Sequence, residues 1–157
     1  MSNLGPQFAK HEADLIRRRS VWQEAGNEHH VQGIVDKHST DAPDLYRGIS
    51  VSPTAHNYID PSKVKVGDRL HLPVSSFTSD RETGVNFAHA ADNDENHHGD
   101  YTPVLFHAQG ARGVNVEHAS NMPWEKEWLS HGQFEVTHKT SDPDNNIPHV
   151  IGLRPTK

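Results

Sequence analysis

Residues 122–129 read Met122-Pro123-Trp124-Glu125-Lys126-Glu127-Trp128-Leu129, and the rest of the sequence is organised around this stretch. Aromatic and apolar residues bracket its charged centre, and the proline and a Ser-His-Gly turn at 130–132 mark its ends, which predicts a short β-strand at 124–129. Side chains alternate between the faces of a strand, so Glu125 and Glu127 would share one face, with about 7 Å between their Cα atoms. The two tryptophans would anchor the opposite face. Two carboxylates on one face repel each other unless a cation or polar group compensates. A solvated edge strand is the alternative interpretation.

The length and composition indicate a single domain over residues 1–157. A chain of 157 residues is long enough to bury a hydrophobic core. Its mean hydropathy of −0.81 is low, but three Trp, five Phe and regularly spaced aliphatic residues argue against general disorder. No apolar run approaches the length of a membrane span, and the N-terminus lacks a signal-peptide pattern, so we expect no membrane partner and a cytoplasmic location. The absence of cysteine excludes disulfides and thiolate metal sites and suits a reducing compartment.

The charge pattern argues against two further classes of function. The formal net charge is −6, so a broad basic face for duplex nucleic acid is not expected. Fourteen histidines invite a metal interpretation, but the adjacent pairs at 29–30 and 97–98 lack the helical i, i+4 spacing of zinc ligands, and no His-Glu-x-x-His motif occurs. We therefore expect no metal site.

Hydrophobic periodicity predicts helices first and strands afterwards. Apolar residues recur at helical spacing between residues 8 and 25, and again at Val31, Ile34 and Val35. A further helix should begin at Ser79, because Ser79 and Glu82 have the spacing of a capping box. This order predicts an α+β fold with a helical part at 1–44 and a core at 45–157. Candidate strands lie at residues 45–51, 70–74, 104–106, 114–116, 134–136 and 150–153.

Three polar features interrupt the apolar strand patterns: Arg47 in Leu-Tyr-Arg-Gly, Ser76 in Ser-Ser-Phe-Thr-Ser, and the Glu-Lys-Glu segment. In this order and spacing they resemble the Arg-Ser-Glu class of mono-ADP-ribosyltransferases, toxin-like enzymes that use NAD. The resemblance covers residues 45–136, most of the chain. It implies an NAD-binding catalytic core of two packed, mostly antiparallel β-sheets with N-terminal helices. It also implies a phage or bacterial effector that acts in the cytoplasm of a bacterial host.

The serine motif departs from the family pattern. The usual Ser-Thr-Ser is best matched by Ser76-Phe77-Thr78, in register with the following Phe87-Ala88. Ser75 and Ser79 are alternatives for the leading serine. The resemblance implies that Ser76, Thr78 and Phe87 contribute to the NAD site.

The chemistry of each motif residue can be compared with a structural alternative. An arginine suits a diphosphate by its charge and fork geometry, so Arg47 is expected to bind NAD; a structural pair with Glu127 is the alternative. Gly48 would let nicotinamide approach the backbone, unless it marks a β-bulge. Ser76 would donate to a carboxylate and fix its rotamer, unless it is a turn residue.

The resemblance assigns different roles to the two glutamates. Glu127 matches the catalytic residue, whose carboxylate would stabilise the oxocarbenium character that develops when the nicotinamide–ribose bond breaks. Glu125 matches the position that orients and deprotonates an acceptor guanidinium, which implies arginine as acceptor. Trp124 and the segment 119–123 match the part that contacts the target protein.

These inferences predict transfer of ADP-ribose from NAD to an arginine of a partner protein, with an RNA acceptor left open. NAD would be a substrate, and no metal would take part. Two alternatives remain: an NAD glycohydrolase with water as acceptor, and a non-catalytic binding module on the same fold.

Overall fold

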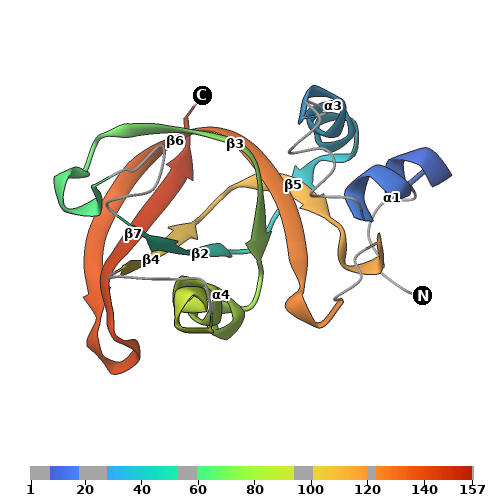
Figure 1. Cartoon of the computed structure of the whole chain (residues 1–157). Coiled ribbons are helices and arrows are strands. Elements are labelled where there is room, and N and C mark those ends of the chain that lie inside the picture. Colours follow the sequence, from blue (N-terminus) through green and yellow to red (C-terminus); the bar gives the residue numbers. More distant parts are fainter. Residues whose placement is uncertain (1–7, 18–27, 53–59, 94–100, 120–122, 157) are drawn as a thin grey trace.

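The computed structural model describes residues 8–17, 28–52, 60–93, 101–119 and 123–156 (Figure 1). Within these residues no helix is long and apolar enough to cross a membrane. The helices are α1 (Lys10–Arg17), α3 (Glu28–His38) and α4 (Arg81–Ala88). The strands are β1 (Thr40–Asp41), β2 (Leu45–Val51), β3 (Arg69–Thr78), β4 (Thr102–Ala108), β5 (Arg112–Asn115), β6 (Glu127–Asp142) and β7 (Ile147–Pro155). Short 3-10 turns are η1 (Pro61–Lys63), η2 (Ala90–Asn93), η3 (Glu117–Ala119), η4 (Pro123–Glu125) and η5 (Pro143–Asn145).

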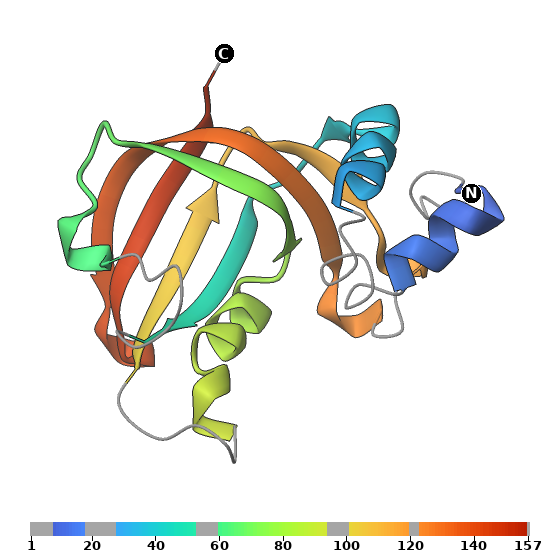
Figure 2. The same ribbon diagram turned by 45° about the horizontal axis from the view of Figure 1, so that its top comes forward.

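Five strands close into a barrel. Figure 2 shows β7, β4 and β2 side by side. The order around the ring is β6-β3-β2-β4-β7, and β7 pairs again with β6. Only the β4–β7 pair is parallel among the described strands. Strands β5 and β1 extend the sheet outward from β6. The mixed, mostly antiparallel architecture agrees with the expected α+β class, but the described strands form one closed sheet instead of two packed sheets.

The long strand β6 explains this difference. Its first half pairs with β3 and its second half with β7, so one strand joins both sides of the barrel. The sequence predicted a turn at 130–132 and a separate strand at 134–136. Instead, Gly132 adopts a φ of 130°, which a glycine tolerates, and the strand bends without ending. The partner β3 shifts register between Leu72 and Ser75 at the same place.

Three apolar clusters hold the elements together. The largest lies inside the barrel and includes Leu45, Phe106, Phe134 and Leu153. A second packs α1 and α3 against β5 and β6, and the predicted apolar face of α3 (Val31, Ile34 and Val35) is buried there. A third lies under α4, on the outer face of β2, β4 and β7.

Helix α4 lies very close to strand β2 because two glycines face each other. A Cβ on Gly48 would collide with the backbone of Gly84 and Ala88, and a Cβ on Gly84 would lie 2.9 Å from the Cβ of Tyr46. The predicted start of this helix was wrong by one residue. Asp80, not Ser79, is the N-cap, and its carboxylate accepts from the backbone N–H and the hydroxyl of Thr83.

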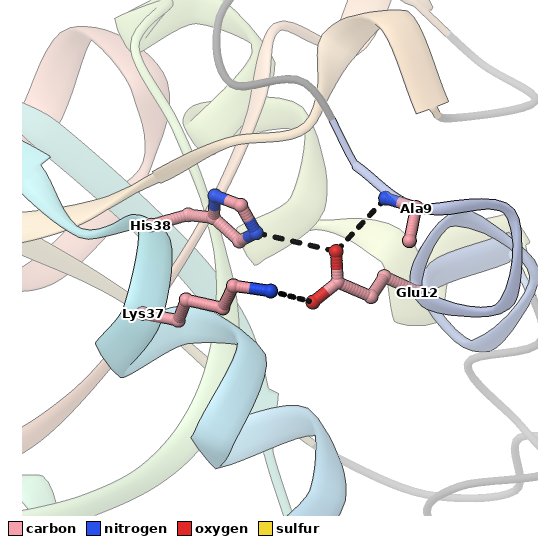
Figure 3. Close-up of polar contacts among 4 residues, drawn as sticks. All are labelled: Ala9, Glu12, Lys37 and His38. Carbon is pink, nitrogen blue, oxygen red and sulfur yellow. Dashed lines mark hydrogen bonds and ion pairs between the residues drawn. The ribbon is translucent and has the colours of Figure 1, made fainter.

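Helices α1 and α3 are joined by a buried carboxylate (Figure 3). Glu12 on α1 is only 4% exposed. Its carboxylate accepts from the backbone N–H of Ala9 at 2.9 Å, and Lys37 Nζ and His38 Nε2 of α3 lie 3.4 and 3.3 Å from its two oxygens. Helix α1 covers residues 10–17 of the helix predicted at 8–25, and residues 18–27 lie outside the described part.

Candidate active site

The site forms where strands β2 and β3 separate. The two strands are paired only at Tyr46 and Thr78, and beyond this point they diverge. Arg47 follows on β2, and its Nη1 donates to the backbone oxygen of Ser76 at 2.9 Å. The guanidinium therefore bridges the two separating strands. Burial lowers the pKa of Arg47 from its ordinary value, so the partly buried cation favours an anionic partner.

Ser76 also holds the second glutamate of the motif. Its hydroxyl donates to Oε2 of Glu127 at 2.5 Å. Glu127 is the first residue of β6, lies opposite Thr78 of β3 and is 4% exposed. Three residues that are far apart in sequence thus meet: the backbone of Ser76 accepts from Arg47, and its side chain donates to Glu127.

The alternative serines have other contacts. Ser75 donates through its hydroxyl to the backbone oxygen of Pro73, and the backbone N–H of Ser79 donates to Lys126 O. Ser76 is therefore the serine of this segment that contacts Glu127 in the structure. The alternative pairing of Arg47 with Glu127 takes an indirect form, through Ser76.

The first glutamate does not lie on a strand, so the predicted strand at 124–129 was wrong in its first half. Glu125 ends the 3-10 turn η4, and Lys126 adopts a left-handed conformation with a φ of 49°. Pairing with β3 ends at Thr78 and Glu127, because β3 leaves the sheet there to enter α4. With no partner strand beyond that point, the chain turns. The hydroxyl of Thr78 secures this turn by donating to the backbone oxygen of Glu125 at 2.7 Å.

The two tryptophans also differ from the expected common anchor. Trp128 is 8% exposed and belongs to the barrel core, whereas Trp124 is 70% exposed. Trp124 lies on the turn beside Glu125, where it is accessible to another molecule. Residues 120–122 of the segment expected to contact a target lie outside the described residues.

Two cavities meet at Ser76 and Phe87, and both residues line each of them. The larger cavity, about 540 Å³, runs between β2 and the end of α4, with Arg47 and Gly48 in its wall. The smaller, about 220 Å³, contains both Glu125 and Glu127. The glutamates thus face the same space although they do not share a strand face. Phe87, exposed by 40%, stands between the two compartments.

Some residues of the larger cavity were not anticipated from the sequence. Ser50 and Ser52 line it from β2 and its end, and Ala90 and Ala91 line it from η2. Ser50 donates its hydroxyl to the backbone oxygen of Ala88, so it also ties β2 to α4. Ser50 lies two residues after Gly48 on β2 and therefore on the same face of the strand. This spacing was the sequence signal that could have identified Ser50. Within the described ranges, no group of three metal-ligating side chains is found.

The sequence matches no protein-family model and no curated protein. Solved structures are similar. The ADP-ribosyltransferase Vis from Vibrio splendidus superposes with a TM-score of 0.62 at 21% identity, over 94% of this chain and 67% of that one. The C3 exoenzyme of Clostridium limosum also superposes with a TM-score of 0.62, at 13% identity, over 96% of this chain and 87% of that one. An ADP-ribosyltransferase of Clostridium botulinum superposes with a TM-score of 0.57 at 14% identity, over 95% of this chain and 88% of that one.

The chain has the ADP-ribosyltransferase fold. The motif resemblance is thereby confirmed at the level of the fold. Within this ADP-ribosyltransferase fold, Arg47, Ser76 and Glu127 come from β2, β3 and β6, three consecutive strands of the barrel. At these identities the likeness concerns the fold, and the chemistry must be argued from the site itself.

Proposed function

We propose that this protein is a mono-ADP-ribosyltransferase that moves ADP-ribose from NAD to an arginine side chain of a target protein. The observation that carries the proposal is the position of Ser76. It joins Arg47 to Glu127 where a larger cavity opens into a smaller one. Such an arrangement suits a long anionic substrate that reacts at one end.

NAD would lie along the larger cavity, with its diphosphate on Arg47. The guanidinium is partly buried, and a charged ligand with fork-compatible oxygens offsets the cost of burying it. Phe87 offers an aromatic surface at the boundary between the two cavities, where nicotinamide would stack. Gly48 has a packing reason to be glycine, because α4 lies against it. Contacts of NAD with Gly48 and Thr78 remain predictions.

The reaction would take place in the smaller cavity. The bond from the ribose C1′ to the nicotinamide nitrogen breaks, and nicotinamide leaves with the electron pair. The carboxylate of Glu127, held by Ser76, stabilises the cationic sugar. A guanidine nitrogen of the acceptor then attacks C1′, and Glu125 accepts the proton that is released. The turn at Glu125 carries the exposed Trp124, so the acceptor would approach from this side.

The choice of arginine as acceptor rests on Glu125 and gains support from one neighbour. The ADP-ribosyltransferase Vis has been crystallised with agmatine, a small guanidine compound. A carboxylate in the second cavity is suited to orient such a group. We further propose that the protein acts as a phage or bacterial effector in a host cytoplasm, which suits a chain without cysteine.

The test supplies NAD with a choice of acceptors. The protein is incubated with labelled NAD and agmatine, with a diamine of similar length as control, or with buffer alone. Free nicotinamide, ADP-ribose and the ADP-ribosylated acceptor are then quantified. We expect nicotinamide release that rises with agmatine and not with the diamine. Equal release in all three mixtures would indicate an NAD glycohydrolase, and no release in any mixture would contradict the proposed function. Transfer of label to RNA in a further mixture that contains RNA would redirect the acceptor assignment.

A further inference from the structure

A third cavity lies on the inner side of the barrel and shares Arg47 with the larger cavity of the candidate active site. Its volume is about 470 Å³. Its wall is mostly aliphatic and aromatic, from four different strands. The apolar residues that define it include Ile49, Leu70, Leu72, Val104, Phe106 and Ile151. We call this cavity the barrel chamber. Its volume is within the range of small-molecule sites.

The charges around the barrel chamber have one sign. Its described lining residues include two cations, Arg47 and Arg69, and no aspartate or glutamate is among them. The whole chain, by contrast, carries a formal net charge of −6. An apolar wall with cations at its edge is complementary to an anionic molecule that has an apolar body.

Arg47 is the cation best placed to meet such an anion. It lines both the barrel chamber and the larger outer cavity, because β2 and β3 separate beside it. A guanidinium has five N–H donors. Within the described residues its hydrogen bond goes from Nη1 to Ser76 O, which leaves donors for a carboxylate that approaches from the chamber.

We propose that the barrel chamber binds an aliphatic monocarboxylate of medium chain length, with its chain against the chamber wall and its carboxylate on Arg47. Binding of the carboxylate is independent of any transferase activity. A second consequence rests on the proposed function: a carboxylate on Arg47 competes with the diphosphate of NAD for the same guanidinium.

The binding test uses a chain-length series. Isothermal titration calorimetry is performed on the full chain with hexanoate, octanoate and decanoate, each below its micelle concentration. Affinity should rise about three- to fourfold for each methylene until the chamber is full, as expected for burial of apolar surface. Alkyltrimethylammonium ions of the same lengths are the charge-reversed controls and should bind at least tenfold more weakly. Equal affinity for both charge types would overturn the proposal, as would affinity that does not depend on chain length.

Two chamber-filling variants and a matched control locate the binding. Val51→Phe and Leu72→Phe each place a phenyl ring at a half-buried position of the chamber wall. The control Val66→Phe makes a similar change at a position that is 62% exposed and does not line the chamber. We expect at least tenfold weaker decanoate binding for either chamber variant that retains the thermal unfolding temperature of the parent, and unchanged binding for Val66→Phe. Decanoate affinity that is the same in all three variants would place binding elsewhere and contradict the proposal.

Competition is measured separately by equilibrium dialysis with labelled NAD. Decanoate should raise the apparent Kd of NAD in the parent protein and not in the chamber-filling variants. Failure of NAD to bind at all would count against the proposed function, while the calorimetry would still decide the inference about the chamber. NAD binding that is insensitive to saturating decanoate would contradict the contact with Arg47.

Discussion

Ser76 contacts both charged groups of the candidate active site. Its backbone oxygen accepts from the guanidinium of Arg47, and its hydroxyl donates to Glu127. A change in the position of β3 would therefore displace the cation and the carboxylate together. Preorganised groups of this kind stabilise developing charge without reorganising during the reaction.

Substitution of the two glutamates should affect NAD hydrolysis and transfer differently. Glu127→Gln should lower the rates of both nicotinamide release and transfer by about 10²–10³-fold, because the sugar cation loses its carboxylate. Glu125→Gln should stop transfer to agmatine and leave slow NAD hydrolysis, because water needs less activation than a guanidinium. Nicotinamide and ADP-ribosylagmatine are measured for both variants, with thermal unfolding as the control for folding. The division of roles is wrong if Glu125→Gln loses hydrolysis as completely as Glu127→Gln.

Arg47→Lys should weaken NAD binding although it conserves the charge. A compact ammonium cannot reproduce the two parallel hydrogen bonds of a guanidinium, nor bridge to Ser76 O in the same geometry. We expect a loss of about 1–3 kcal/mol, or roughly 5- to 150-fold in Kd. Equilibrium dialysis with labelled NAD measures this loss. An unchanged Kd in a folded variant would show that Arg47 is a structural residue.

At the scale of elements, local patterns predicted some features and missed others for physical reasons. The apolar spacing of α3 was sufficient because Val31, Ile34 and Val35 pack on one face. The turn at Glu125 was missed because the end of a strand depends on its partner, and β3 leaves the sheet opposite Glu127. A left-handed lysine is also rare, so Lys126 gave no signal.

Substitution of Gly48 tests how closely α4 must pack on β2. Gly48→Ala should destabilise the protein by about 1–3 kcal/mol, since its methyl group would collide with the backbone of α4. Gly33→Ala is the matched control: Gly33 is exposed on α3 with no atom within 4 Å of its Cβ position, and it should stabilise by about 0.5–1 kcal/mol. Chemical denaturation measures both. Equal effects of the two substitutions would contradict the close approach of α4.

The contact between α1 and α3 should depend on pH through Glu12. The backbone N–H of Ala9 lowers the pKa of this carboxyl more than burial raises it, and His38 and Lys37 lower it further. A depressed pKa gives stability that is present above the unfolded value, near 4.3, and is lost as pH falls through the folded value. Glu12→Gln should therefore cost about 1–2 kcal/mol at pH 7 and progressively less below about pH 4. Unfolding free energies of both proteins across this range measure the effect, and a constant difference would contradict it.

At the scale of the whole molecule, local sequence patterns could not predict that the barrel closes. Closure depends on β6 pairing with β3 through one half and with β7 through the other, and these partners lie far from each other in sequence. The motif residues could nevertheless be singled out as candidates, because a buried-strand arginine and paired carboxylates are costly and stand out against apolar surroundings. Their roles in NAD binding and catalysis stay predictions. Their neighbours Ser50, Ala90 and Ala91 were not found, because serine and alanine are ordinary at such positions.

The whole molecule should also work without a metal ion. In the proposed function Arg47 would supply the positive charge for the diphosphate. The described residues hold no cluster of metal ligands. The rings of His29 and His30 contact each other at a tilted angle on α3, a helix that packs against β5 and β6 through a cluster separate from the barrel core. His97 and His98 lie outside the described residues. We expect full nicotinamide release after dialysis against EDTA, and no increase when Mg²⁺ or Zn²⁺ is returned. The control is the same protein dialysed without EDTA. Activity that disappears on chelation and returns only with a divalent ion would show that a metal shares the diphosphate with Arg47.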